Sequence, residues 1–178
     1  MYISEISSNA PVAFLTSLQK NVYATLETLN IPFQRVETHD LVTMEDCARV
    51  NEKFQAQMVK TLYLCNSQKT KYYLFITTGP KPFNSKAFSK ALGSSRVSFA
   101  DRYVMEHHLD VKIGAATIFS LLLEHNNTVQ LVLDADVVDQ QWYACSDGTT
   151  SNYLKFRTRS LLETLLPHMR HLPEIVTL

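Results

Sequence analysis

Three short stretches of the sequence place polar or small residues where they could do chemistry. Lys60 directly precedes the apolar run 61–65, so a cation stands where a strand is expected to begin. The Gly-Ala-Ala-Thr run at 114–117 has small side chains, and its backbone N–H groups could approach a ligand closely, as in an oxyanion-binding loop. Ser146 and Asp147 open a stretch rich in hydroxyl groups. Each stretch also has a plainer interpretation: a surface lysine, a simple turn and a hairpin turn.

No self-sufficient catalytic motif accompanies these stretches. The sequence has no P-loop, dinucleotide-binding glycine run, nucleophile elbow or helical zinc motif. The serine and aspartate of the third stretch could be combined with any of six histidines, but the spacing selects none. A hydrolase that depends on Ser146 or Cys145 is therefore one open alternative, although Cys65 and Cys145 both lie in apolar contexts that keep a thiol inert. His107 and His108 diverge on a helix, so we expect one in solvent and one at the core edge.

Composition and charge are those of an ordinary globular protein. The chain has 178 residues, 46% hydrophobic and 19% charged, which suits one domain with its own core. Seventeen basic residues balance seventeen acidic ones, so any contact with RNA must be local. Three widely spaced cysteines favour reduced thiols over disulfides or a zinc site. No membrane-spanning run or signal peptide is recognisable, so we expect a cytoplasmic protein, with no metal or cofactor.

Periodicity and capping residues predict the elements. We expect helices at 11–30, 43–53, 84–92, 102–109 and from 158 onward. We expect strands at 33–38, 61–65, 71–77, 128–133, 142–144 and 153–156. Thr43 and Ser98 are each followed three residues later by an aspartate, which is capping-box spacing. Asn84 and Gly93 bracket one helix, and Thr158 is placed to cap the last.

The order of these elements predicts a mixed α/β (α+β) fold. Strands arrive as hairpins rather than in regular alternation with helices, which favours a single domain with a mixed, largely antiparallel sheet surrounded by helices. We expect residues 29–178 to form one compact unit and residues 1–28 to form an N-terminal helical extension. The extension could cap the sheet or mediate a dimer, so a monomer and a homodimer both remain open.

Placed in order, these features resemble the YbaK-like family of prolyl-tRNA-synthetase-associated editing domains and free-standing prolyl-tRNA deacylases. The number, order and spacing of the matching segments carry the resemblance, which runs from about residue 29 to residue 178. The segments are His39-Asp-Leu-Val-Thr-Met-Glu45, Lys60-Thr-Leu-Tyr-Leu64, Ser85-Lys86 through Leu92-Gly93, Val97-Ser-Phe-Ala100, Ile113-Gly-Ala-Ala-Thr117, Val132-Leu-Asp134 and Phe156-Arg-Thr-Arg-Ser-Leu-Leu162.

The resemblance implies hydrolysis of the ester that joins a wrongly chosen amino acid to the terminal adenosine of tRNA. It implies that Lys60 holds the phosphate beside that adenosine and that the Gly114, Ala115 and Ala116 N–H groups bind the ester carbonyl. The substrate's ribose hydroxyl would assist the attacking water, and a small pocket would select alanine, serine, threonine or cysteine on a non-cognate tRNA such as tRNA-Pro. The implied substrate contacts are His39, Thr43, Thr61, Thr117, Ser146 and Asp147. The implied partners are the 3′ acceptor end of tRNA and an aminoacyl-tRNA synthetase.

The sequence also departs from the family pattern. Asp40 and Ile118 stand where the family has prolines, and residues 146–147 replace a His-Pro pair. These departures keep open a second hypothesis: a non-catalytic module on the same fold that binds tRNA or a synthetase. Retention of Lys60 and Gly114 favours the enzyme. A set of basic residues could form either a modest tRNA-facing patch or a solvated surface: Lys81, Lys86, Lys90, Arg96 and Arg102.

Overall fold

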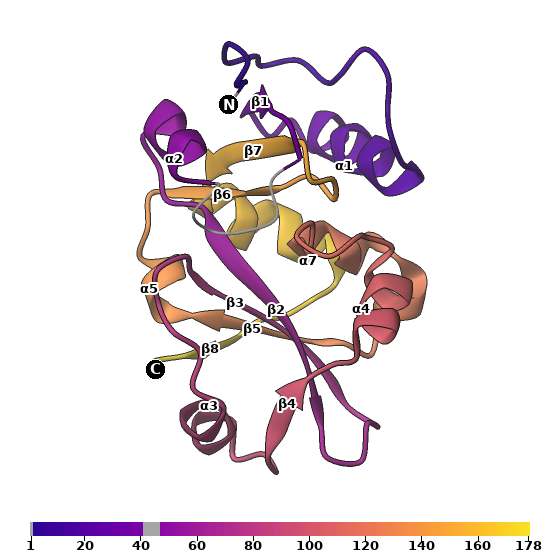
Figure 1. The fold of residues 1–178 in the computed structure, drawn as a ribbon, viewed down its shortest axis with the longest axis vertical. Coiled ribbons are helices and arrows are strands. Elements are labelled where there is room, and N and C mark those ends of the chain that lie inside the picture. The colour runs from indigo at the N-terminus through magenta and orange to yellow at the C-terminus, as the bar shows by residue number, and fades with distance from the viewer. Residues whose placement is uncertain (1, 41–46) are drawn as a thin grey trace.

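The strands form two sheets that lie on either side of one core (Figure 1). The computed structural model describes residues 2–40 and 47–178. The smaller sheet is antiparallel, in the order β1-β7-β6, and the larger has the order β4-β2-β3-β5-β8, with β5 and β8 added in parallel. The strands are β1 (Phe33–Glu37), β2 (Val59–Asn66), β3 (Tyr72–Thr78), β4 (Val97–Phe99), β5 (Gln130–Asp134), β6 (Trp142–Ser146), β7 (Asn152–Arg157) and β8 (Glu174–Val176). The mixed α+β class is confirmed, with two sheets where one was expected.

Short helices surround and separate the sheets (Figure 1). The first four are α1 (Ser17–Thr28), α2 (Ala48–Phe54), α3 (Ser85–Leu92) and α4 (Arg102–Leu109). The remainder are η1 (Ile118–Leu122), η2 (Glu124–Asn126), α5 (Ala135–Val138), α6 (Thr158–Ser160), η3 (Leu161–Leu165, a π-helical turn) and α7 (Leu166–Met169). In the part of the chain that the structure describes, no helix has the length and apolar character needed to cross a membrane.

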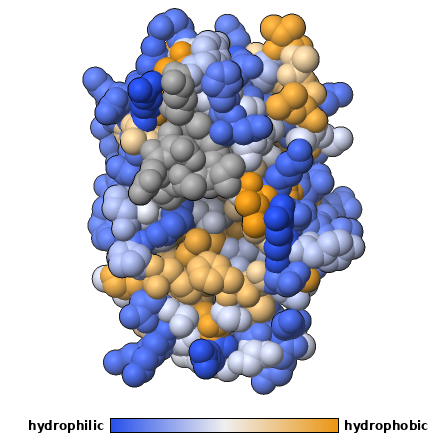
Figure 2. All heavy atoms as spheres, in the orientation of Figure 1, coloured by the Kyte–Doolittle hydropathy of each residue, from blue (hydrophilic) through white to orange (hydrophobic). Residues whose placement is uncertain are grey.

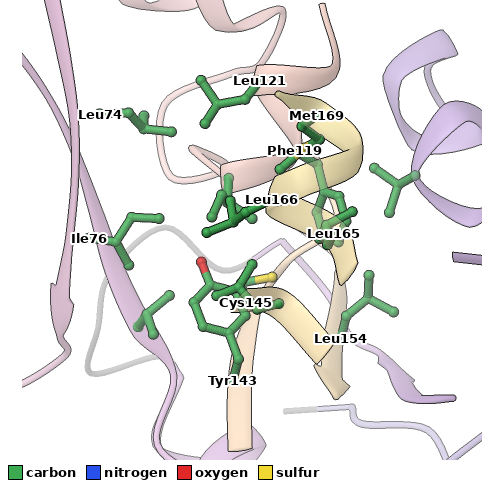
Figure 3. Packing of buried hydrophobic residues seen from close by; sticks show 14 of the residues in the cluster. Leu74, Ile76, Phe119, Leu121, Tyr143, Cys145, Leu154, Leu165, Leu166 and Met169 are labelled. Atoms are coloured by element: carbon green, nitrogen blue, oxygen red, sulfur yellow. The ribbon is translucent and has the colours of Figure 1, made fainter. Parts of the chain in front are cut away.

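The main core lies between the larger sheet and the C-terminal helical segment. Leu74 and Ile76 of β3 point toward Leu165 and Leu166, as Figure 3 shows. Alternate residues of β2 and β3 therefore face this core, and the intervening residues face a second apolar cluster on the opposite side of the sheet. The sheet is buried on both faces over much of its width, which explains why its strands are continuous apolar runs.

The hydroxyl group of Tyr143 is buried in this core without a hydrogen-bond partner among the described residues. Figure 3 shows it pointing inward from β6. Because an unpaired buried hydroxyl costs free energy, we expect Tyr143→Phe to raise the free energy of unfolding by up to about 1 kcal/mol, measured by urea denaturation. Tyr153→Phe is the matched control, because the Tyr153 hydroxyl donates to the Thr150 carbonyl at 2.8 Å and its loss should destabilise. If both variants are destabilised equally, the conclusion that the Tyr143 hydroxyl lacks a hydrogen-bond partner would be contradicted.

The N-terminal helix belongs to the main core. Leu18, Val22 and Leu26 of α1 are buried in the same cluster as the strands of both sheets. The helix begins later than predicted, at Ser17 rather than Pro11, because Thr16 is the N-cap and accepts a hydrogen bond from the Gln19 N–H at 3.0 Å. The helix therefore packs against the body of the domain.

The predicted caps have mixed outcomes. Asn84 and Gly93 bracket α3 as expected, and the Asn84 side chain accepts from the Ala87 N–H. The capping box at Ser98 is wrong, because Ser98 lies in β4 and Asp101 itself caps α4. Thr158 is also not a cap: it is the first residue of α6, and its buried hydroxyl has no partner among the described residues. The spacing of residues along the sequence did not show that Ser98 would lie in a strand instead of capping a helix.

Candidate functional site

A cavity of about 570 Å³ opens where four segments far apart in the sequence meet. Its walls come from the start of α1, the residue that follows His39, the end of α4 with the loop after it, and the turn between β6 and β7. The lining residues are Leu15, Thr16, Asp40, Glu106, Asp110, Val111, Lys112, Ala115, Gly148, Thr149, Thr150 and Ser151. The hydroxyl-rich stretch is therefore a hairpin turn, as its sequence allowed, and it also forms one wall of the cavity.

The small-residue loop forms a tight turn at the edge of this cavity. The Ala115 N–H donates to the Lys112 carbonyl at 3.0 Å, and Gly114 has a φ of 86° at the third position of the turn. Positive φ at that position alone is the signature of a type II turn, so the backbone itself favours glycine there. The Ala115 N–H is thus occupied, whereas the N–H groups of Gly114 and Ala116 have no partner among the described residues.

Thr117 joins this loop to the smaller sheet. Its side chain is fully buried, and its hydroxyl donates to the Ser146 carbonyl at 2.7 Å. The same oxygen accepts from the Phe119 N–H at 3.4 Å and so caps η1. Thr117 is therefore a structural link that holds the loop against the end of β6.

Ser146 and Asp147 are buried within the β6–β7 turn. The Ser146 hydroxyl donates to the Thr149 carbonyl at 2.6 Å and accepts from the Gly148 N–H at 3.0 Å. Asp147 Oδ1 accepts from both the backbone N–H and the hydroxyl of Thr149, at 3.1 and 2.8 Å. Their side chains shape the turn, and the neighbouring residues Thr149–Ser151 present their surface to the cavity.

The other oxygen of Asp147 anchors the N-terminal helix. Asp147 Oδ2 accepts from the Gln19 amide at 2.8 Å and from the Tyr23 hydroxyl at 2.9 Å. Gln19 in turn accepts from the Leu15 N–H at 2.6 Å, which fixes the start of α1 at the cavity wall. Burial raises the pKa of Asp147, and the hydrogen bonds from Gln19, Thr149 and Tyr23 oppose that rise. Neither Gln19 nor Tyr23 was identified from the sequence.

Lys60 does not line this cavity; it lies on the outer face of the larger sheet. Its ammonium group donates to the Lys81 carbonyl and has no ion-pair partner among the described residues. Burial lowers the pKa of Lys60, because the charged form loses solvation. Lys81, by contrast, is paired with Asp134 at 2.8 Å and with Asp136 at 2.7 Å. Lys60 is thus an unneutralised cation beside a neutralised one.

The remaining predicted contacts are dispersed. Thr61 follows Lys60 on β2, so its side chain lies on the opposite face, toward the main core. His39 is exposed, with its ring 5.7 Å from that of Tyr2, and it immediately precedes the cavity residue Asp40. Thr43 falls outside the described residues. The structure therefore groups the 114–117 loop with the β6–β7 turn and leaves Lys60 on another surface.

The alternative nucleophiles are poorly placed for catalysis. Ser146 is 5% exposed and its hydroxyl is hydrogen-bonded within its own turn, and among the described residues no histidine forms a hydrogen bond with it. Cys145 is 1% exposed, and burial raises its pKa well above that of a free thiol. As for metals, no three His, Cys, Asp or Glu side chains within residues 2–40 and 47–178 are grouped to hold an ion. His107 is exposed and His108 is partly buried, as predicted.

Comparison with known proteins places the chain in a family. The family model of the aminoacyl-tRNA editing domain matches residues 38–164. The prolyl-tRNA editing protein ProX of Acetoanaerobium sticklandii is 24% identical over 130 residues, which cover 73% of this chain and 79% of ProX. Prolyl-tRNA synthetase associated domain-containing protein 1 of Danio rerio is 24% identical over 162 residues, 90% of this chain and 87% of that protein.

A solved structure supports the same fold. The crystal structure of a protein described as a candidate trans-editing enzyme for prolyl-tRNA synthetase superposes with a TM-score of 0.67 at 17% identity, covering 93% of this chain and 99% of that one. The match of the family model over more than two thirds of the sequence agrees with this likeness. The chain belongs to the aminoacyl-tRNA editing domain family.

Proposed function

We propose that this protein is a trans-editing hydrolase that removes a small, wrongly attached amino acid from tRNA. Membership of the editing family supports this proposal, as does the similarity to ProX, which is named as a prolyl-tRNA editing protein. Alanine, serine, threonine and cysteine are the proposed amino acids, and tRNA-Pro is the proposed carrier. A pocket that excludes larger residues would give the selectivity of a second sieve.

The observation that carries the proposal is the turn at 112–115 beside a cavity of about 570 Å³. Water attacks the ester carbonyl carbon, assisted by the neighbouring ribose hydroxyl of the substrate. The N–H groups of Gly114 and Ala116 donate to the oxygen on which negative charge develops. The bond from the carbonyl carbon to the ribose oxygen then breaks, the ribose oxygen takes up a proton, and a free amino acid leaves the tRNA. Lys60 holds a backbone phosphate of the bound strand as a point charge.

The test is deacylation of tRNA-Pro charged separately with alanine, serine, threonine and cysteine. We expect the purified protein to hydrolyse at least one of these esters well above the spontaneous rate and to leave prolyl-tRNA-Pro intact. Release of the labelled amino acid measures the reaction. Failure to hydrolyse any of the four, with the protein shown to be folded, would reject the proposal.

A second candidate is a non-catalytic module that binds tRNA or a synthetase. The observation that favours it is the burial of Ser146 and Asp147, which stand where the family has a His-Pro pair and are engaged in internal hydrogen bonds. Binding of uncharged tRNA without hydrolysis of any mischarged tRNA would select this candidate.

A further inference from the structure

The charge of this neutral chain is sharply segregated along the sequence. Of its seventeen basic residues, eight lie between residues 53 and 100, and no aspartate or glutamate occurs in that interval. They are Lys53, Lys60, Lys69, Lys71, Lys81, Lys86, Lys90 and Arg96. This interval contains the end of α2, the helix α3 and the strands β2, β3 and β4, which are three neighbouring strands at one edge of the larger sheet. Lys53 is paired with Glu5, and Lys81 with Asp134 and Asp136, whereas the other six have no ion-pair partner among the described residues. We call these six the basic lobe, and their unpaired charge suits a polyanionic partner: Lys60, Lys69, Lys71, Lys86, Lys90 and Arg96.

Apolar side chains are exposed on the same lobe. Phe99 lies on the short edge strand β4 and is 60% exposed, and Phe83 and Leu62 beside it are partly exposed. The rings of Phe83 and Phe99 are 5.4 Å apart. We call Leu62, Phe83 and Phe99 the aromatic shelf. Figure 2 shows a band of hydrophobic surface across the lower half of the molecule, over the larger sheet.

The aromatic shelf has a rigid base. Phe83 packs against the buried rings of Phe88 and Phe75, with ring centres 5.8 and 6.0 Å apart. Phe99 pairs with Leu64 of β2 and therefore shares its face of the sheet. Exposed aromatic rings held in fixed positions lose little conformational entropy when a ligand stacks on them.

Lys60 stands at one end of the shelf. Lys60 and Leu62 are two residues apart on β2, so their side chains share a face and lie about 7 Å apart. The Lys60 ammonium group donates to the carbonyl of Lys81, which is two residues before Phe83. An unneutralised cation is thus continuous with a stacking surface. A cation beside exposed aromatic rings is typical of surfaces that bind single-stranded nucleic acids, because cations pair with the phosphates and aromatic rings stack on the unpaired bases.

We infer that the aromatic shelf binds the unpaired nucleotides at the 3′ end of tRNA, with bases stacked on Phe99 and Phe83 and a phosphate on Lys60. The identity of the RNA rests on the proposed function, whereas the chemistry of the ligand rests on the shelf and the basic lobe. The shelf lies outside the cavity at the 114–117 loop, so it would hold the strand rather than the ester.

The test uses a short single-stranded RNA that ends in CCA, labelled at its 5′ end, with binding measured by fluorescence anisotropy. We expect Phe99→Ala to weaken binding about 5- to 150-fold, the range found for losing one base–aromatic stack, and Phe99→Trp to restore it. Tyr103→Ala is the matched control, because Tyr103 is 75% exposed on α4 and stacks on His107 instead. We expect it to bind like the wild type.

The outcomes separate this inference from the proposed function. The inference that the shelf binds RNA would be rejected if the wild type does not bind the RNA, or if Phe99→Ala binds it as tightly as Tyr103→Ala does. Either result would hold even if mischarged tRNA is hydrolysed. If RNA binding depends on Phe99 but no ester is hydrolysed, the RNA-binding role of the shelf is supported and the proposed hydrolase activity is rejected. A dimer in solution that Phe99→Ala converts to a monomer, with RNA binding unchanged, would show that the shelf contacts a second copy and would also overturn the inference.

Discussion

Asp147→Ala is expected to lower the free energy of unfolding by about 3–5 kcal/mol, because it removes a buried acceptor that several donors share. The carboxylate accepts hydrogen bonds from Gln19 and Tyr23 on one oxygen and from Thr149 on the other. All of these donors are buried, so removing their acceptor leaves them without water or protein partners. Urea denaturation followed by circular dichroism measures the loss.

Asp147→Asn tests the hydrogen bonds alone, because asparagine has nearly the same volume as aspartate but replaces one acceptor oxygen with a donor N–H₂ group. The Gln19 amide cannot reverse without losing its bond from the Leu15 N–H, and the backbone N–H of Thr149 cannot reverse at all. Whichever way an asparagine amide is turned, its own N–H₂ therefore faces a donor. We expect a loss of about 1–3 kcal/mol. Asp139→Asn, at an exposed carboxylate, is the matched control and should change stability by less than about 0.5 kcal/mol. Equal stability of all three variants would contradict the anchoring role.

Lys60→Ala is expected to lower kcat/KM for a mischarged tRNA by about 10- to 150-fold, the equivalent of one charge-assisted hydrogen bond. Lys60 has no ion-pair partner among the described residues, so its charge is available for a phosphate, whereas the charge of Lys81 is held by Asp134 and Asp136. If Lys60 holds the phosphate equally in the ground state and in the transition state, KM rises and kcat is kept. Initial rates over a range of tRNA concentrations separate the two constants.

The matched control for this experiment is Lys20→Ala, which removes an exposed lysine on α1, outside the basic lobe. We expect it to react like the wild type. Lys60→Arg keeps the charge in a different geometry and should recover part of the activity. If kcat/KM changes less than twofold in Lys60→Ala, or falls equally in Lys60→Ala and Lys20→Ala, Lys60 does not belong to the site. Neither result would contradict the proposed hydrolase activity.

The sequence by itself determined the local elements and the family. The β2–β3 hairpin, α3 between Asn84 and Gly93, and the loop at 114–117 could be predicted, because each depends on residues only a few positions apart. Capping, periodicity and turn chemistry act over that range. The ordered segments from His39 to Leu162 indicated the family for the same reason, since spacing along the chain is all that such a resemblance needs.

Only the tertiary structure decided which polar side chains pair with one another. Asp147 meets Gln19 across 128 residues, and no local pattern marks either side chain as the partner of the other. They pair because a buried carboxylate needs hydrogen-bond donors, and the packing of the chain brings the Gln19 amide next to it. The same holds for Lys60 on β2 and Lys81 in the turn after β3, two neighbouring lysines that differ because Asp134 at the end of β5 pairs with Lys81 only. Burial and long-range pairing are properties of the packed chain, and they determine which of these polar residues remain available to a substrate.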